Sequence, residues 1–177
     1  PEGSGTPGAR NSRASPNLGP TFSGLRHQPV TPGPGESVQV STFIEDPDGV
    51  GEATLRYSVE GGAWREIGMR SSAGGLYQGT IPGQPAARTV QFYVEAGDSV
   101  AAAAPWPAGG VDSRALYRTR DGQARLGELH NIRIIMTGDD SSLLYRTTNV
   151  MSNDLVGATV VYNEREAFYD AGVRLRG

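Results

Sequence analysis

Residues 38–59, VQVSTFIEDPDGVGEATLRYSV, decide the fold class of this chain. Apolar or β-branched side chains recur at every second position, first at Val38, Val40, Thr42 and Ile44 and again at Leu55, Tyr57 and Val59. A period of two is typical of strands that bury one face. Between the two runs, Asp46-Pro47-Asp48-Gly49 has the composition of a turn. The stretch therefore predicts two strands joined by a tight connection.

The same alternation continues along the middle of the chain. Further strands are expected over residues 64–69, 76–81 and 90–96, with turn signals at Gly61-Gly62 and Pro82-Gly83. The 25 glycines and 12 prolines of the 177 residues also favour short strands and turns over helices. We predict a mainly β protein, with an immunoglobulin-like or fibronectin type III-like β-sandwich over residues 21–104.

Composition excludes several kinds of active site. The chain has no cysteine, and all 16 of its basic residues are arginine. Disulfides, thiolate metal sites, thiol nucleophiles, Schiff bases and lysine-anchored phosphate loops are therefore impossible within it. The net charge of −3 provides no general attraction to nucleic acid, and no apolar run is long enough to span a membrane.

Charge and composition divide the chain into parts. Residues 1–20, rich in proline, glycine and serine, predict a disordered lead-in, because they cannot bury enough apolar surface to fold. Residues 36–104 carry nine acidic and four basic side chains, whereas residues 105–177 carry nine of each. We expect a linker over 105–127 and a second unit over 128–177. The chain begins at Pro1 without a signal peptide, which leads us to expect a piece of a longer protein.

The last part predicts an incomplete α+β segment. Strands are expected over 129–136, 156–162 and 167–175, with a polar hairpin turn at 163–166 and a short helix over 139–146 that Thr137 or Asp139 would cap. His130 falls on a mostly apolar face of the first of these strands and is expected to be a core residue. The strand pattern continues to the last residue, so we expect a sheet with an unpaired edge and a poorly ordered tail.

Two resemblances extend this interpretation. Residues 29–98, with the Asp-Pro-Asp-Gly turn, Tyr57-Ser58-Val59 and Val90-Gln91-Phe92-Tyr93-Val94, resemble the immunoglobulin-like modules of large bacterial secreted proteins, which are mostly spacers and adhesion surfaces. Residues 112–177 resemble the start of the CotH kinase family, named for a spore-coat protein. The best matching pieces are Asn149-Val150-Met151-Ser152-Asn153 and the final Tyr169-Asp170-Ala171-Gly172-Val173-Arg174-Leu175-Arg176-Gly177.

The second resemblance implies an atypical kinase-like fold whose N-terminal sheet these strands begin. It also implies ATP and Mg²⁺ as cofactors of a parent protein that phosphorylates protein hydroxyls, at a bacterial cell surface or outside the cell. The family's later nucleotide-binding and metal-binding motifs have no counterpart in these residues, so this chain alone is expected to be inactive.

Few residues qualify as site candidates. Arg174 and Arg176 share one face of the last predicted strand and could point at a nucleotide in a complete protein, although a solvated strand face is the simpler interpretation. Asp139 and Asp140 are more typical of helix first-turn acids than of a metal pair. Asp46 and Asp48 have the spacing that opens a calcium loop, but Tyr57 occupies the position where an EF-hand needs a carboxylate.

Two functions therefore compete. The first is the N-terminal fragment of a CotH-like kinase, with a spacer or adhesion module and without the catalytic core. The second is a non-enzymatic extracellular module that binds polysaccharide, protein or Ca²⁺, with tryptophans and tyrosines as the sugar-contacting candidates. Trp64 is more readily explained by packing at the rim of the sandwich, and Trp106 as an anchor at the junction between the two units.

Overall fold

The structure is a computed structural model that describes residues 17–123, 130–149 and 152–176. Its strands are β1 (Thr21–Gln28), β2 (Val38–Glu45), β3 (Val50–Val59), β4 (Arg65–Gly68), β5 (Arg70–Ser72), β6 (Leu76–Ile81), β7 (Thr89–Asp98), β8 (Ala103–Trp106), β9 (Leu116–Arg118), β10 (Ile132–Ile135), β11 (Val156–Tyr162) and β12 (Glu166–Val173). Its helical segments are α1 (Gly138–Leu144) and two single 3₁₀ turns, η1 (Ala73–Gly75) and η2 (Gly110–Asp112). The protein is mainly β, as the sequence predicts.

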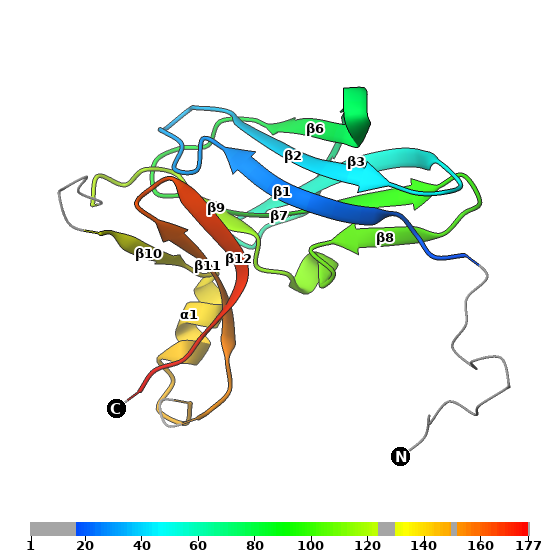
Figure 1. Cartoon of the computed structure of the whole chain (residues 1–177). Coiled ribbons are helices and arrows are strands. Elements are labelled where there is room, and N and C mark those ends of the chain that lie inside the picture. The colour runs from blue at the N-terminus through cyan, green and yellow to red at the C-terminus, as the bar shows by residue number, and fades with distance from the viewer. Residues whose placement is uncertain (1–16, 124–129, 150–151, 177) are drawn as a thin grey trace, which may run out of the picture.

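Two antiparallel sheets form the larger part of the molecule (Figure 1). One has the strand order β1-β2-β6-β5, and the other has the order β4-β3-β7-β8 with β9 also paired to β7. Both sheets contribute to one core, in which Val38 and Val40 from the first sheet and Leu55, Phe92 and Val94 from the second are fully buried. This arrangement is consistent with the predicted β-sandwich.

The period-two pattern predicts which side chains are buried. Along β2, Val38, Val40, Thr42 and Ile44 point inward, while the residues between them are half-buried or exposed. Thr42 satisfies its buried hydroxyl by donating to the carbonyl of Ser23 at 2.9 Å. The turn after β2 also forms as expected, with the Gly49 amide donating to the Asp46 carbonyl at 3.1 Å and Gly49 at a φ of +90°, which favours glycine.

Short strands occupy parts of the chain for which the sequence predicts a linker. Residues 105–127 are predicted as a linker, but 105–106 end β8 and 116–118 form β9, and both strands pair with β7. The lead-in predicted over 1–20 lies outside the described residues up to position 16, and Asn17 donates a hydrogen bond to Asp98 at 2.6 Å. Strands of three or four residues contain too few alternations to be recognised from sequence.

A third antiparallel sheet, in the order β10-β11-β12, packs with α1 beside the sandwich (Figure 1). Its inner face contributes Ile135 and Val161 to a small core that also contains Val30 and Leu116 of the sandwich part. Thr137 caps α1, as predicted, by accepting a hydrogen bond from the Asp140 amide at 3.1 Å. This second core fixes one face of the third sheet against the sandwich.

Three predictions for this part need correction. His130 is exposed rather than a core residue, because Ile135 faces the core while Ile132 and Ile134 point outward and are more than half exposed. The helix ends at Leu144, two residues before the predicted end. The last strand stops at Val173, so Arg174 lies beyond it.

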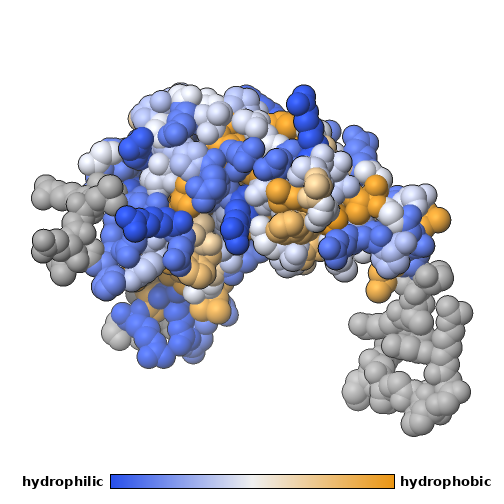
Figure 2. All heavy atoms as spheres, turned by 45° about the horizontal axis from the view of Figure 1, so that its top comes forward, coloured by the Kyte–Doolittle hydropathy of each residue, from blue (hydrophilic) through white to orange (hydrophobic). Residues whose placement is uncertain are grey.

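On the face of the molecule shown in Figure 2, small hydrophobic patches lie among hydrophilic side chains. In the described parts of the chain, no helix combines the length and the hydrophobicity needed to cross a membrane.

Candidate functional site

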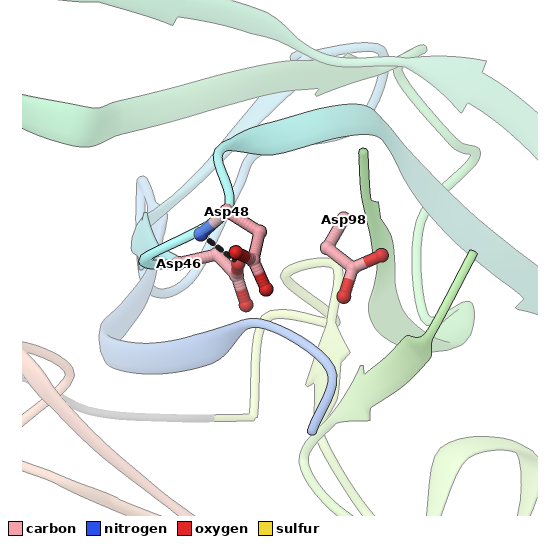
Figure 3. A group of neighbouring side chains, drawn as sticks. All are labelled: Asp46, Asp48 and Asp98. Carbon is pink, nitrogen blue, oxygen red and sulfur yellow. Dashed lines mark hydrogen bonds between the residues drawn. The ribbon is translucent and has the colours of Figure 1, made fainter. Parts of the chain in front are cut away.

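Three aspartates meet at one end of the sandwich. Asp46 and Asp48 lie in the turn between β2 and β3, and Asp98 ends β7 (Figure 3). One carboxylate oxygen from each lies within 4.8 Å of the others. Two oxygens bound to the same Ca²⁺ lie at most about 5 Å apart, since each bond measures about 2.3–2.6 Å. The spacing of the three carboxylates therefore fits a calcium ion.

Hydrogen bonds hold Asp98 in position within this cluster. Its Oδ1 accepts from the amides of Val100 and Ala102, both at 2.9 Å, and its Oδ2 accepts from Asn17 at 2.6 Å. Burial is the largest influence on the pKa of Asp98 and raises it, but the hydrogen bonds from Asn17 and the backbone together outweigh burial. The net pKa lies below its ordinary value, so Asp98 is a carboxylate at neutral pH.

The aspartate turn also has a purely local explanation. The Asp46 carboxylate accepts from the Asp48 amide at 2.8 Å, which is the hydrogen bond of an Asx-turn. Ser99, next to Asp98, donates through its amide to the Gly49 carbonyl at 3.1 Å and through its hydroxyl to the Asp48 carbonyl. These bonds tie the β2–β3 turn to the end of β7 without a metal. The Asp46 side chain and the Asp48 backbone therefore contribute to the fold with or without a metal.

The two predicted nucleotide-binding arginines lie elsewhere. Arg174 follows β12 and donates to the side chain of Asn153 at 3.0 Å, and Arg176 is exposed. Because both lie after the end of β12, the strand face that they were expected to share does not exist. Neither lines the cavities at Arg133, between β1 and β12, or beside Gly138.

The predicted first-turn acids of α1 have different environments. Asp139 is exposed, whereas Asp140 is buried and forms an ion pair with Arg114, whose Nη2 lies 3.2 Å from the Asp140 Oδ1. Arg114 precedes β9 in the sandwich part of the chain, so this ion pair crosses between the two parts. It favours a structural role for Asp140 over metal binding.

A buried histidine links the sandwich to the third sheet. His27 of β1 is 1% exposed, and its Nε2 lies 2.9 Å from the Val30 carbonyl. Because a carbonyl can only accept, Nε2 carries the proton and Nδ1 is an acceptor in the neutral ring. The Tyr169 hydroxyl of β12 therefore donates to Nδ1, at 2.6 Å. Burial lowers the pKa of His27 from 6.5 to about 4, although the bond to Val30 partly opposes this.

A second buried contact joins the two parts through the backbone. Thr159 of β11 is fully buried; its hydroxyl accepts from the Leu116 amide at 2.8 Å and donates to the Arg114 carbonyl. The Thr159 side chain of the third sheet thus satisfies the Leu116 amide at the start of β9 and the Arg114 carbonyl two residues earlier. Since an unsatisfied buried backbone group costs about 1–3 kcal/mol, these groups depend on the third sheet.

The two tryptophans considered for sugar binding are packed against other rings. Trp64 lies edge-to-face on Tyr93, with ring centroids 5.1 Å apart, and Trp106 stacks in parallel on Phe22 at 6.3 Å. The exposed His130 ring stacks on Tyr162, and its Nδ1 forms a hydrogen bond with the Tyr162 hydroxyl. These contacts agree with rim packing for Trp64.

Comparison with known proteins finds no protein-family model that matches the chain and no similar curated protein. These comparisons therefore add nothing to a functional assignment.

Sequence reasoning missed Asp98 as the neighbour of Asp46 and Asp48, and it missed the pairing of His27 with Tyr169. It considered Asp140 as a first-turn acid or metal-pair candidate and did not identify Arg114 as its partner. Asp98 comes 50 residues after Asp48, and only the pairing of β3 with β7 brings them together. The available signal was that Asp46 and Asp48 follow the predicted strand over residues 38–44, and that Asp98 follows the predicted strand over residues 90–96. No pattern near His27 indicates Tyr169, which lies 142 positions away.

Proposed function

We propose that this chain is a non-catalytic support module: an immunoglobulin-like sandwich held in a fixed orientation against the first strands of a CotH-like kinase domain. The resemblance of residues 112–177 to that family suggests the identity of the second part. The orientation rests on the buried contacts between the two parts. We take the parent to act outside the cell or at its surface, with protein hydroxyls as substrates.

The observation that carries this proposal is the hydroxyl of Thr159, which bonds two backbone groups of the sandwich part from within the third sheet. The ion pair of Arg114 with Asp140 and the hydrogen bond of His27 with Tyr169 lie at the same boundary. A flexible spacer would not bury polar groups that only its neighbour can satisfy, because each would be left without a partner whenever the two parts separate.

The chain itself offers little of what phosphoryl transfer needs. That reaction requires a cationic cradle for the phosphates, acidic ligands for Mg²⁺ and a group that receives the substrate proton. The sequence has no lysine. Among residues 17–123, 130–149 and 152–176, the three carboxylates at one end of the sandwich are the group suited to a metal. They lie at the β2–β3 turn and the end of β7, in the sandwich itself.

Two measurements test the support role. Residual dipolar couplings from the sandwich and from the third sheet should fit one alignment tensor, and Thr159→Val should make the two tensors differ while Thr159→Ser keeps one. ATP with Mg²⁺ should raise the melting temperature of the chain no more than inorganic triphosphate with Mg²⁺ does. Independent tensors in the unmodified chain would refute the fixed orientation, and stabilisation by ATP beyond that given by inorganic triphosphate would refute the non-catalytic assignment.

Calcium binding is a second candidate function, favoured by the convergence of Asp46, Asp48 and Asp98. A Ca²⁺ ion there would join the β2–β3 turn to the end of β7, in the manner of an extracellular module stiffened by calcium. Such a site would still need further oxygen ligands, since Ca²⁺ takes six to eight. Backbone carbonyls of the turn and water are the candidates for these positions.

The calcium candidate has a direct test. CaCl₂ at 100 times its dissociation constant should stabilise the chain by about 2.7 kcal/mol, and the backbone amide resonances of Asp46, Asp48, Gly49 and residues 97–99 should shift. Asp48→Asn should abolish the response, because the Asp48 side chain is exposed and its loss removes a ligand without disturbing the core. Asp139→Asn, at an exposed acid of α1, is the control. A response that survives Asp48→Asn would exclude this site.

A further inference from the structure

A cleft of about 390 Å³ lies where the sandwich meets the third sheet. Arg120 and Asp121, which follow β9, line one side, and Arg133 of β10 with the turn between β11 and β12 lines the other. That turn contributes Asn163, Glu164 and Arg165. The volume is in the range of small-molecule sites, and the lining is dominated by charged side chains.

The charges on the floor of the cleft neutralise one another. Arg133, whose side chain is 14% exposed, lies 3.2 Å from Glu164 and 3.5 Å from Asp121. Asp121 also pairs with Arg118 at 3.3 Å, and Glu164 accepts from the Thr31 hydroxyl at 2.6 Å. Both carboxylates therefore have their lone pairs largely engaged within the fold.

Asp121 remains ionised in this setting. The amide of Gln123 is the largest influence and lowers the pKa of Asp121, burial opposes it, and Arg118 and Arg133 lower it further. The ion pairs of the floor therefore persist at neutral pH. Because these charges compensate one another, they do not neutralise the other two arginines of the cleft, Arg120 and Arg165.

Two arginines lie at the rim. The Arg120 side chain is 63% exposed and has a long, solvated ion pair with Glu36, at 4.0 Å, so its guanidinium keeps free N–H donors. The Glu36 Oε2 also accepts from the Gly33 amide at 2.7 Å. Within the described ranges, no carboxylate lies within 4.0 Å of the exposed Arg165 guanidinium.

The amide of Asn163, which lines the same cleft, adds a neutral donor. Its Oδ1 accepts from the Asn131 backbone at 2.9 Å, which orients the side chain and leaves the NH₂ group without a hydrogen-bond partner among the residues that the structure describes. The cleft thus presents two guanidinium groups and one amide NH₂ that can donate, and its acceptors are already paired. An arrangement of surplus donors around a neutral floor is suited to an anion.

We propose that this cleft binds a small ligand through an oxyanion group, a carboxylate, phosphate or sulfate, held by Arg120 and Arg165 with Asn163 as a third donor. Guanidinium groups recognise each of these anions through paired N–H donors. Because the cleft is formed by both parts of the chain, the ligand would also strengthen the contact between them.

Titration with inorganic phosphate, sulfate and malonate tests the proposal, each at constant ionic strength maintained with chloride. We expect saturable shifts of the Arg120 and Arg165 Nε–H resonances with at least one anion, and the ranking of the three identifies the preferred group. The double variant Arg120→Gln/Arg165→Gln should weaken binding at least tenfold. Arg70→Gln, at an exposed arginine of β5, is the matched control and should leave binding unchanged.

Three results would overturn the proposal. One is the absence of saturation by any of the anions up to about 20 mM, which would occupy most of a site with a dissociation constant of about 1 mM. Another is unchanged affinity in the double variant. The third is an equal loss in Arg70→Gln, which would indicate general screening of surface charge. Circular dichroism of each variant, together with the wild-type resonance shifts, separates a binding defect from a folding defect.

Discussion

Acidification should destabilise this protein through its buried histidine. His27 has a pKa of about 4 in the folded chain and about 6.5 when unfolded. Above pH 6.5 the ring is neutral in both states, so it has no effect on the pH dependence of stability. Between pH 6.5 and pH 4, the His27 ring binds a proton in the unfolded state and stays neutral in the folded state. Stability is therefore lost as pH falls through this window and the loss levels off below pH 4.

The magnitude follows from the difference between the two pKa values. A shift of 2.5 units at 1.36 kcal/mol per unit predicts a loss of about 3 kcal/mol from His27 alone between pH 7.5 and pH 3.5. The structural cause is the surroundings of the ring, which packs against Phe92, Tyr117 and Tyr169. Among the residues that the structure describes, its polar partners are the Val30 carbonyl and the Tyr169 hydroxyl. A charged ring there would lose its hydration, and its two hydrogen bonds would compensate only a small part of that cost.

Urea denaturation at a series of pH values measures this effect. Carboxylates also contribute to acid destabilisation, so the decisive quantity is the difference in pH dependence between the wild type and His27→Gln, with His130→Gln as the control for an exposed histidine. NMR titration of the His27 ring gives the folded-state pKa directly, even if His27→Gln folds poorly. A measured pKa near 6.5, or equal pH dependence in the wild type and His27→Gln, would refute the reasoning.

Two further predictions concern pairs of matched positions. Tyr169→Phe should destabilise the chain by about 1–3 kcal/mol, because it leaves a buried nitrogen without its donor, whereas Tyr117→Phe should be neutral or stabilising, since the buried Tyr117 hydroxyl has no hydrogen-bond partner among the described residues. Denaturant midpoints compare them, and equal losses would contradict the hydrogen-bond assignment. Gly83→Ala should cost about 1–3 kcal/mol, because an added Cβ would lie 2.1 Å from the Gly35 carbonyl oxygen, whereas Gly68→Ala meets no atom within 4 Å and should cost less. Thermal melting checks this pair, and similar melting temperatures for the two variants would count against the predicted clash.

Local pattern was sufficient for the long strands. Strands β2 and β3 contain several alternating positions, and an alternation of that length identifies both the strand and its more buried face. For β6 and β7 the pattern identified the strand alone, since β7 is buried on both faces over most of its length. The Thr137 cap of α1 was also predictable, because an N-cap depends on residues within one turn of the helix. The three-residue strand β9 and the outward direction of the face that carries His130 were not predictable, since neither has enough local pattern to distinguish the alternatives.

What the sequence by itself determined is the mainly β class, the turns between the longer strands, and the kinds of chemistry that a chain without cysteine or lysine cannot perform. Only the tertiary structure decided which distant side chains meet: Asp98 with Asp48, Tyr169 with His27, and Asp140 with Arg114. The physical reason is that strand alternation depends on the nearest neighbours in the chain, whereas these contacts depend on sheet pairing and on how one sheet packs against another. Such packing is set by the whole buried surface, and no single segment encodes it.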